Sequence, residues 1–232
     1  MHKKIFEIFR TVGINHFYGD FFDSRFYISY LLSKSHTKNM LDIGCGVGVI
    51  LEAAPNCFKV GTDISLESLK HAKKLNKNIE YVQSDAQSLP FKDGFFTTIT
   101  AMHLFSVIKN VGGNWKLAVK ETKRISASKS IIFITGANRP SRHFEKTHPS
   151  KRREEYLKHV EQVKEFTDKF KVTLEGYGPH SRFLMFPFKI IYKLPDVVSE
   201  KLGLEKFLFW FCKSRKYLKN GRSYVIICRT NN

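Results

Sequence analysis

Short apolar runs alternate with longer segments of helical spacing along most of the chain. The apolar runs predict strands at residues 39–44, 58–63, 79–83, 95–101, 130–135, 172–176 and 223–229. Apolar positions at three- and four-residue intervals predict helices at residues 1–12, 20–35, 65–76 and 115–125, and another helix that follows a glycine turn and ends near residue 54. This alternation predicts an α/β fold with a doubly wound, mostly parallel sheet and helices on both faces.

The length of 232 residues fits a single domain, 1–232. We expect N-terminal helices in residues 1–38 and the core of the sheet in residues 39–138. The sixth and seventh predicted strands are separated by residues 177–222, a segment that is too long for a bare hairpin loop. We therefore expect a helical lid or insertion there.

The composition favours a cytoplasmic globular protein. The hydrophobic fraction is 42%, and the chain has no run of 18 uncharged apolar residues that would form a membrane-spanning helix. Glu7 and Arg10 interrupt the apolar core that a signal peptide needs. The four cysteines show no paired spacing, which argues against a disulfide framework or a zinc site and suits a reducing compartment.

A glycine-rich turn after the first predicted strand is the strongest chemical signal. The stretch LDIGCGVG places Gly44, Gly46 and Gly48 between a strand and a helix, and Asp63 ends the next strand 19 positions after Gly44. Ligands of parallel sheets bind beyond the carboxyl ends of the strands, where glycine lets them approach the backbone. An acidic residue at the next strand end accepts hydrogen bonds from ribose hydroxyls. The pattern predicts a ligand that contains a nucleoside.

Two details of the turn favour a ligand with an amino group over a dinucleotide. The dinucleotide fingerprint is G-x-G-x-x-G, whereas the third glycine of this chain, Gly48, comes one residue early. Asp42 also lies within the motif, where its carboxylate would repel a pyrophosphate and attract an ammonium group.

With these motifs the chain resembles the class I S-adenosylmethionine-dependent methyltransferases, in particular the branch that methylates small molecules and lipids such as quinone precursors. LDIGCGVG is similar to the first motif of that family, VGTDIS to the second, and SDAQSLPFKDGFFTTIT to the third and fourth. The resemblance covers residues 39–135. It implies a Rossmann-like methyltransferase fold whose last strand is antiparallel, and S-adenosyl-L-methionine as the cofactor.

The resemblance also implies which residues surround the methionine part of the cofactor. They are Asp42, Gly44, Cys45, Gly46 and Gly48. Cys45 would serve there as a small residue rather than as a nucleophile.

The adenosine part of the cofactor would lie against the ends of the next two strands. The resemblance implies that Asp63 holds the ribose and that Ile64 flanks the adenine. Asp85 would meet the adenine amino group, with Ala86 beside it.

The transfer itself needs few protein groups, because the sulfonium is a strong electrophile and the protein orients the acceptor. Met102 and His103, in AMHLFSVI, would line the methyl-donor pocket. His103 is the candidate general base for a protonated acceptor, since an imidazole titrates near neutral pH. The alternative is a histidine that starts a helix or only shapes the pocket. Thr97, Ser106 and Val107 stand where the family often has acidic residues or histidine, so an acid–base role at these positions is in doubt.

The net charge of +18 favours polyanionic partners, although a lysine-rich surface without a specific partner is an alternative. Residues 181–217 combine nine aromatic, eight basic and three acidic residues. They predict a helical lid over the substrate pocket, a peripheral contact with an anionic membrane, or an RNA-binding surface of stacking aromatic side chains.

Three functions follow from these observations. We favour transfer of a methyl group to a small-molecule or lipid-like acceptor. The second hypothesis is RNA methylation through the basic surface, although the chain lacks the N/D-P-P-Y/F tetrapeptide of amino-directed nucleic-acid methylases. The third is a scaffold that binds the cofactor without catalysis. Oxygen, nitrogen and carbon acceptors are all compatible with the sequence.

Overall fold

A computed structural model describes residues 24–33, 35, 37–54, 56–137, 161–177 and 223–230. The helix predicted at residues 1–12 lies outside these residues, and so does the insertion predicted at 177–222 apart from Tyr177. The aromatic and basic segment 181–217 is therefore outside the described part of the chain.

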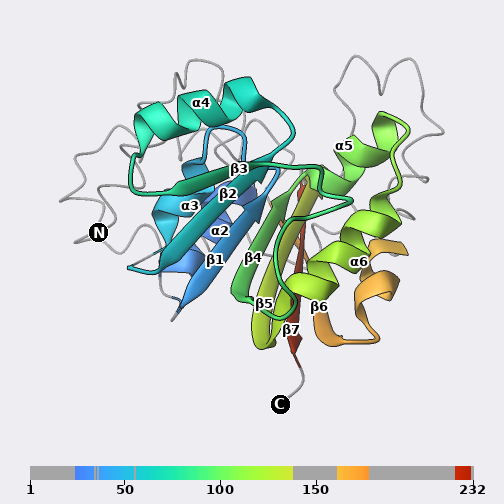
Figure 1. The fold of residues 1–232 in the computed structure, drawn as a ribbon. Coiled ribbons are helices and arrows are strands. Elements are labelled where there is room, and N and C mark those ends of the chain that lie inside the picture. The colour runs from blue at the N-terminus through green and yellow to red at the C-terminus, as the bar shows by residue number, and fades with distance from the viewer. Residues whose placement is uncertain are drawn as a thin grey trace, which may run out of the picture.

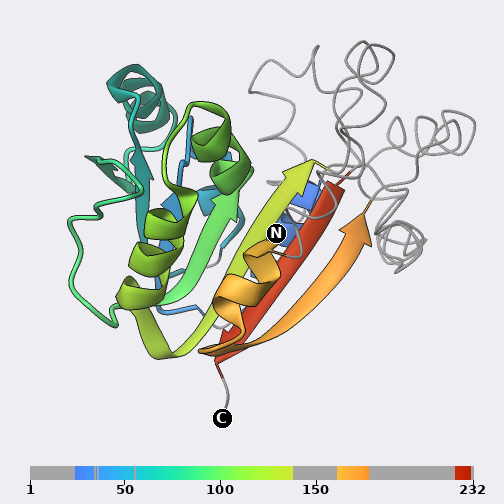
Figure 2. The same ribbon diagram turned by 90° about the vertical axis from the view of Figure 1, so that its right-hand side faces the viewer.

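Seven strands form one sheet in the order β3-β2-β1-β4-β5-β7-β6 (Figure 1). The strands are β1 (Asn39–Ile43), β2 (Phe58–Asp63), β3 (Glu80–Gln83), β4 (Phe96–Met102), β5 (Ser126–Ala137), β6 (Phe170–Tyr177) and β7 (Ser223–Thr230). The first five strands pair in parallel, and β7 lies antiparallel between β5 and β6 (Figure 2). The predicted sheet, mostly parallel with an antiparallel last strand, is confirmed.

Helices cover both faces of the sheet (Figure 1). One face carries α2 (Ser24–Ser33), α3 (Val49–Ala53) and α4 (Leu66–Leu75), and the other carries α5 (Leu104–Asn110), α6 (Trp115–Ile125) and the helical residues 161–166. Side chains of β1 alternate between the two faces, since Met40 belongs to the first buried cluster whereas Leu41 and Ile43 belong to the second. β1 is therefore buried on both sides, as its apolar sequence predicts.

Local side chains set the starts of two helices. The Ser65 hydroxyl caps α4 by accepting a hydrogen bond from Ser68 N at 3.2 Å. The Asn114 carboxamide oxygen caps α6 by accepting from Lys116 N at 3.1 Å. His103 precedes α5 without a capping hydrogen bond from its side chain. The two capped helices match their predicted positions closely, whereas α5 is not among the predicted helices.

Candidate functional site

The predicted site residues lie at the carboxyl edge of the parallel strands. The strand order reverses between β1 and β4, which is where open α/β sheets bind their ligands. Asp42 lies near the end of β1, Asp63 ends β2, Asp85 follows β3 and His103 follows β4. Four neighbouring strand ends therefore carry the residues that the sequence predicts.

The turn between β1 and α3 has a backbone that favours glycine. Gly44, Gly46 and Gly48 have φ angles of 71°, 53° and 80°. A Cβ atom added to Gly46 would meet no described atom within 4 Å, so the turn leaves open space above its backbone. A Cβ atom added to Gly48 would lie 2.5 Å from the Tyr81 hydroxyl. Glycine is therefore needed at residue 48 for packing as well as for conformation.

Asp63 joins the end of β2 to the glycine turn. Its Oδ2 accepts a hydrogen bond from Gly46 N at 2.9 Å, and its Oδ1 accepts one from Ser65 N at 2.9 Å. These two backbone donors fix the carboxylate beside the turn. Each carboxylate oxygen can still accept a further hydrogen bond, so the group retains capacity for hydroxyl donors of a ligand.

Asp42 is a buried carboxyl group close to the same turn. Its residue is 2% exposed, and its Oδ1 accepts a hydrogen bond from the Thr100 hydroxyl at 2.6 Å. Burial raises the pKa of Asp42 to about 7, the Thr100 hydrogen bond opposes this effect, and the charge of Asp63 adds to it. A ligand ammonium group near Asp42 would offset both the burial and the repulsion.

Cys45 occupies the turn as a buried, protonated thiol. Its Sγ lies 2.8 Å from the position of a Cβ added to Gly61 in β2. Burial raises the pKa of the Cys45 thiol, and the charges of Asp42 and Asp63 raise it further. The thiolate required for nucleophilic chemistry is therefore disfavoured, and the geometry gives Cys45 a packing role.

The ends of β2 and β3 carry an exposed apolar side chain and an exposed carboxylate, respectively. Ile64 is 71% exposed, and its carbonyl oxygen accepts a hydrogen bond from Gln83 Nε2 at 3.0 Å. Asp85 is exposed and forms a turn in which its Oδ1 accepts from Gln87 N at 2.8 Å. Ala86 packs partly against the core. An apolar surface beside an acceptor suits a flat heteroaromatic ring with an amino group.

His103 and Met102 end the fourth strand in different ways. His103 has a φ of 60°, the one positive value among the described residues other than glycine. Its backbone N–H donates to Thr135 O at 2.9 Å. Met102 packs partly against the core, and its Sδ accepts a hydrogen bond from the Thr135 hydroxyl at 3.8 Å. The structure therefore places His103 at the sheet edge in a conformation that is rare for a side-chain-bearing residue.

Thr97 does not reach the site. Its hydroxyl accepts hydrogen bonds from Lys38 N and Asn39 N, both at 3.2 Å, and donates to Asn39 O at 3.1 Å. These contacts hold the beginning of β1, at the opposite edge of the sheet. Val107 is 55% exposed on α5.

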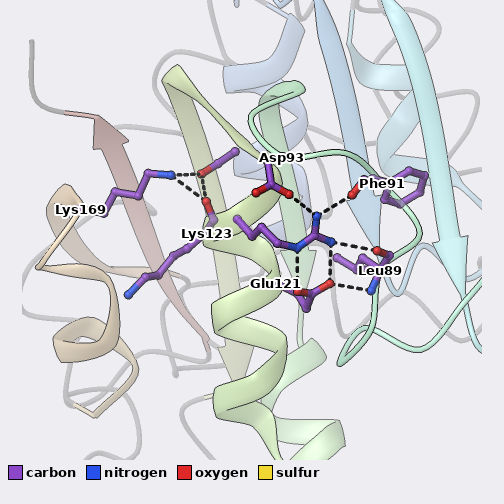
Figure 3. Close-up of polar contacts among 8 residues, drawn as sticks. Leu89, Phe91, Asp93, Glu121, Lys123 and Lys169 are labelled. Carbon is purple, nitrogen blue, oxygen red and sulfur yellow. Dashed lines mark hydrogen bonds and ion pairs between the residues drawn. The ribbon is translucent and has the colours of Figure 1, made fainter.

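A second group of polar residues, which the sequence interpretation missed, fastens the segment between β3 and β4 to α6. The group comprises Gln87, Asn114, Glu121 and Arg124, and Figure 3 shows part of it. The three-residue spacing of Glu121 and Arg124 predicts a pair within one helix, but it gives no sign that both reach a distant loop.

Within the described ranges, no three His, Cys, Asp or Glu side chains gather as they would around a metal ion. In the same ranges, every helix is too short or too polar to cross a membrane.

The strands that carry the site match a known protein family. A family model described as "Methyltransferase domain" matches residues 41–134. This range runs from β1 to β5 and contains the glycine turn, Asp63, Asp85 and His103.

Curated relatives share the same part of the chain. An uncharacterised protein of Methanocaldococcus jannaschii is 31% identical over 117 residues, which are 49% of this chain and 48% of the relative. The tRNA (carboxymethyluridine(34)-5-O)-methyltransferase of Arabidopsis thaliana is 31% identical over 110 residues, which are 46% of this chain and 26% of the relative. Ajmaline N-methyltransferase of Rauvolfia serpentina is 26% identical over 106 residues, which are 42% of this chain and 35% of the relative. The chain spans about half or less of the length of these relatives.

Solved structures resemble the fold over nearly the whole chain. A Thermotoga maritima S-adenosylmethionine-dependent methyltransferase, described as a possible histamine N-methyltransferase, has a TM-score of 0.57 and 15% identity over 98% of this chain and 100% of its own. The plantazolicin methyltransferase BpumL, solved with S-adenosylhomocysteine, has a TM-score of 0.58 and 16% identity over 96% of this chain and 90% of its own. Residues 41–134 of this chain therefore match a methyltransferase domain, and the predicted fold, which is also that of these S-adenosylmethionine-dependent methyltransferase structures, is confirmed.

Proposed function

We propose that this protein transfers a methyl group from S-adenosyl-L-methionine to a small-molecule or lipid-like acceptor. The observation that carries the proposal is the meeting of Asp42, the glycine turn, Asp63 and Asp85 at three neighbouring strand ends, those of β1, β2 and β3. The match of residues 41–134 to a methyltransferase domain supports the same reaction class.

The residues of this edge fit each part of the cofactor by their chemistry. The open space above Gly46 suits the methionine part, and buried Asp42 offers a negative charge to its ammonium group. Asp63 has acceptor capacity for the ribose hydroxyls. Ile64 and Asp85 offer an apolar surface and an acceptor to the adenine.

S-Adenosylmethionine supplies an electrophilic methyl group when it is bound. The protein's own contribution is to hold an acceptor in line with that group and to exclude water. We assign His103 the role of general base, which takes the proton of an acceptor hydroxyl or amine. The left-handed backbone of His103 supports this assignment, because strained residues gather at functional sites.

Two kinds of acceptor are represented among the relatives. Ajmaline N-methyltransferase supports a small organic acceptor, whereas the Arabidopsis tRNA methyltransferase supports RNA. The charge of +18 suits RNA and also suits contact with an anionic membrane that would deliver a lipid-like acceptor. RNA methylation is therefore the second candidate function.

Calorimetric titration with S-adenosylhomocysteine tests cofactor binding. Asp63→Ala removes the predicted ribose acceptor, and we expect it to weaken binding by about ten- to a hundredfold, as the loss of hydrogen bonds to a charged group predicts. Asp168→Ala is the matched control, since Asp168 lies in the turn before β6 and pairs with Lys123 at 2.6 Å. Equal affinities of the two variants for S-adenosylhomocysteine would contradict the assignment of Asp63 to the ribose.

Transfer of a radiolabelled methyl group from S-adenosylmethionine tests the acceptor class. We expect label in a lipid or small-molecule extract and none in RNA; the reverse result would establish the second candidate. His103→Asn keeps a side chain that tolerates the left-handed backbone and removes the imidazole. We expect kcat to fall by about a hundredfold or more with unchanged S-adenosylhomocysteine affinity. An unchanged kcat would leave His103 a structural role only.

A further inference from the structure

Gln87 connects the Asp85 carboxylate to the start of α6. Its N–H donates to Asp85 Oδ1 at 2.8 Å, and its Nε2 donates to Oδ1 at 3.2 Å and to Oδ2 at 3.1 Å. Its Oε1 accepts a hydrogen bond from Asn114 N, at the N-cap of α6, at 2.8 Å. A Cβ atom added to the neighbouring Gly113 would lie 3.5 Å from Gln87 Nε2. Both ends of the carboxamide are therefore engaged, which fixes its orientation.

Glu121 and Arg124 fasten the same segment to the other end of α6. Glu121 Oε2 accepts from Leu89 N at 2.8 Å, and Arg124 Nη2 donates to Leu89 O at 2.9 Å (Figure 3). Arg124 Nη1 donates to Phe91 O and to Asp93 Oδ1, both at 2.7 Å. Arg124 also donates to both carboxylate oxygens of Glu121, at 2.8 and 2.7 Å. Three of these contacts reach the main chain of the loop, at Leu89 N, Leu89 O and Phe91 O, and one reaches the Asp93 side chain.

Helix α6 is a rigid frame for these contacts. Ten residues separate Asn114 from Arg124, which corresponds to about 15 Å along a helix. The helix is anchored on the sheet by its buried face, which consists of Trp115, Ala118, Val119, Thr122 and Ile125. A loop held at two points of one anchored helix keeps its conformation before a ligand arrives, and this reduces the entropy lost on binding.

The hydrogen bonds of Gln87 leave one carboxylate oxygen of Asp85 better suited to accept from a ligand. Oδ1 already has two donors, Gln87 N and Nε2, whereas Oδ2 shares only Nε2. A carboxylate oxygen has about two lone-pair directions, so Oδ2 retains acceptor capacity. We propose that Gln87 is a positioning residue that presents Asp85 Oδ2 to the exocyclic amino group of adenine, and that it thereby sets the selectivity for an adenine-containing cofactor. The inference rests on the proposed function, in which Asp85 meets the adenine.

Calorimetric titration of the full chain with two ligands tests this role. The ligands are S-adenosylhomocysteine and its analogue with unsubstituted purine, which lacks the amino group. Gln87→Glu keeps the acceptor for Asn114 N but replaces the Nε2 donor by an oxygen that repels Asp85, and Gln87→Ala removes both contacts. Asn78→Asp is the matched control, because it adds the same charge at an exposed turn before β3, at the opposite edge of the sheet.

We expect the wild type and the Asn78→Asp control to prefer S-adenosylhomocysteine by about tenfold or more, the effect of one hydrogen bond to a charged group. Both Gln87 variants should reduce this preference to about threefold or less, while affinity for the purine analogue stays nearly constant. Circular dichroism melting curves check that the variants remain folded; a loss of structure alone would weaken binding of both ligands equally.

The outcomes separate this inference from the function on which it rests. A wild type that does not bind S-adenosylhomocysteine would remove the proposed function and the inference together. Binding with the same preference in the wild type and in both Gln87 variants would overturn the inference and leave the proposed function standing. A wild type that binds both ligands equally would also overturn it.

Discussion

Replacing Asp42 by asparagine tests how the buried carboxyl affects folding. Asp42 is 2% exposed and accepts a hydrogen bond from the Thr100 hydroxyl at 2.6 Å. Asparagine has nearly the same shape and keeps an oxygen that can accept from Thr100, but it cannot ionise. The substitution therefore removes the charge without opening a cavity.

The expected magnitude follows from the pKa of Asp42. Folding raises it from 3.8 to about 7, chiefly because burial disfavours the charged form. The folded state thus binds this proton more tightly than the unfolded state, so the free energy of unfolding falls as the pH rises from about 4 to about 7. At about 1.4 kcal/mol per pKa unit, the whole contribution is about 4 kcal/mol. We expect Asp42→Asn to be more stable than the wild type by up to about 4 kcal/mol at pH 8, and by much less at pH 4.

Urea-induced unfolding at several pH values between 4 and 8, without ligand and followed by circular dichroism, measures this difference. Asp168→Asn is a control for which the change of stability with pH should have the opposite sign. A hydrogen bond from Lys123 lowers the pKa of Asp168, so its contribution is present at neutral pH and is lost on acidification. The reasoning would be refuted if Asp42→Asn were less stable than the wild type at pH 8, or if it kept the wild-type slope between pH 4 and 7.

Three further predictions follow from the same region. Gly48→Ala should lower the free energy of unfolding by about 2–4 kcal/mol, and Gly94→Ala should lower it by about 1 kcal/mol. Both glycines have a positive φ, but only at Gly48 would the added methyl group meet Tyr81. Equal losses in urea titrations would contradict the clash. Tyr81→Phe should change stability by less than about 1 kcal/mol, since its buried hydroxyl has no hydrogen-bond partner among the described residues; a loss above about 2 kcal/mol would count against this. Calorimetry should show S-adenosylhomocysteine binding more tightly at pH 8 than at pH 6, because ionised Asp42 attracts the ligand ammonium, and Asp42→Asn should abolish the difference.

The sheet was largely predictable because buried apolar residues mark most of its strands, as Met40, Leu41 and Ile43 do in β1. The bounds of β2 and α6 agree with the predicted residues, and the predicted β5 is too short. β5 begins at Ser126, directly after α6. Ser126 pairs with Phe96 of β4, and after a register shift the next pair is Ile131 with Thr98. A strand that starts with SASK has no apolar run to reveal it.

Helix α5 escaped prediction for a related reason. It is seven residues long, and His103 provides no capping hydrogen bond from its side chain. Short helices of this kind form through packing on the sheet, where Phe105 is buried, rather than through their own sequence signals.

The candidate site divides in the same way between local and distant contacts. The glycine turn and Asp63 could be predicted because their spacing along the chain fixes their place at two neighbouring strand ends. The contact of Gln87 with Asn114 could not, because it joins residues 27 positions apart through a loop and a helix cap whose relative placement depends on the folded sheet.

The position of β7 has a consequence for how this protein folds during synthesis. β7 pairs with β5 on one side and β6 on the other, so residues 126–137 and 170–177 have no common partner until residues 223–230 leave the ribosome. The backbone amides and carbonyls along one side of β5 stay unpaired during that interval, as a template for strands of other chains. Ser130 N donates to the Thr230 hydroxyl at 3.1 Å, so this hydrogen bond of β5 forms only after 100 further residues have been synthesised. The strand order thus leaves one edge of β5 open until the central antiparallel strand has been synthesised.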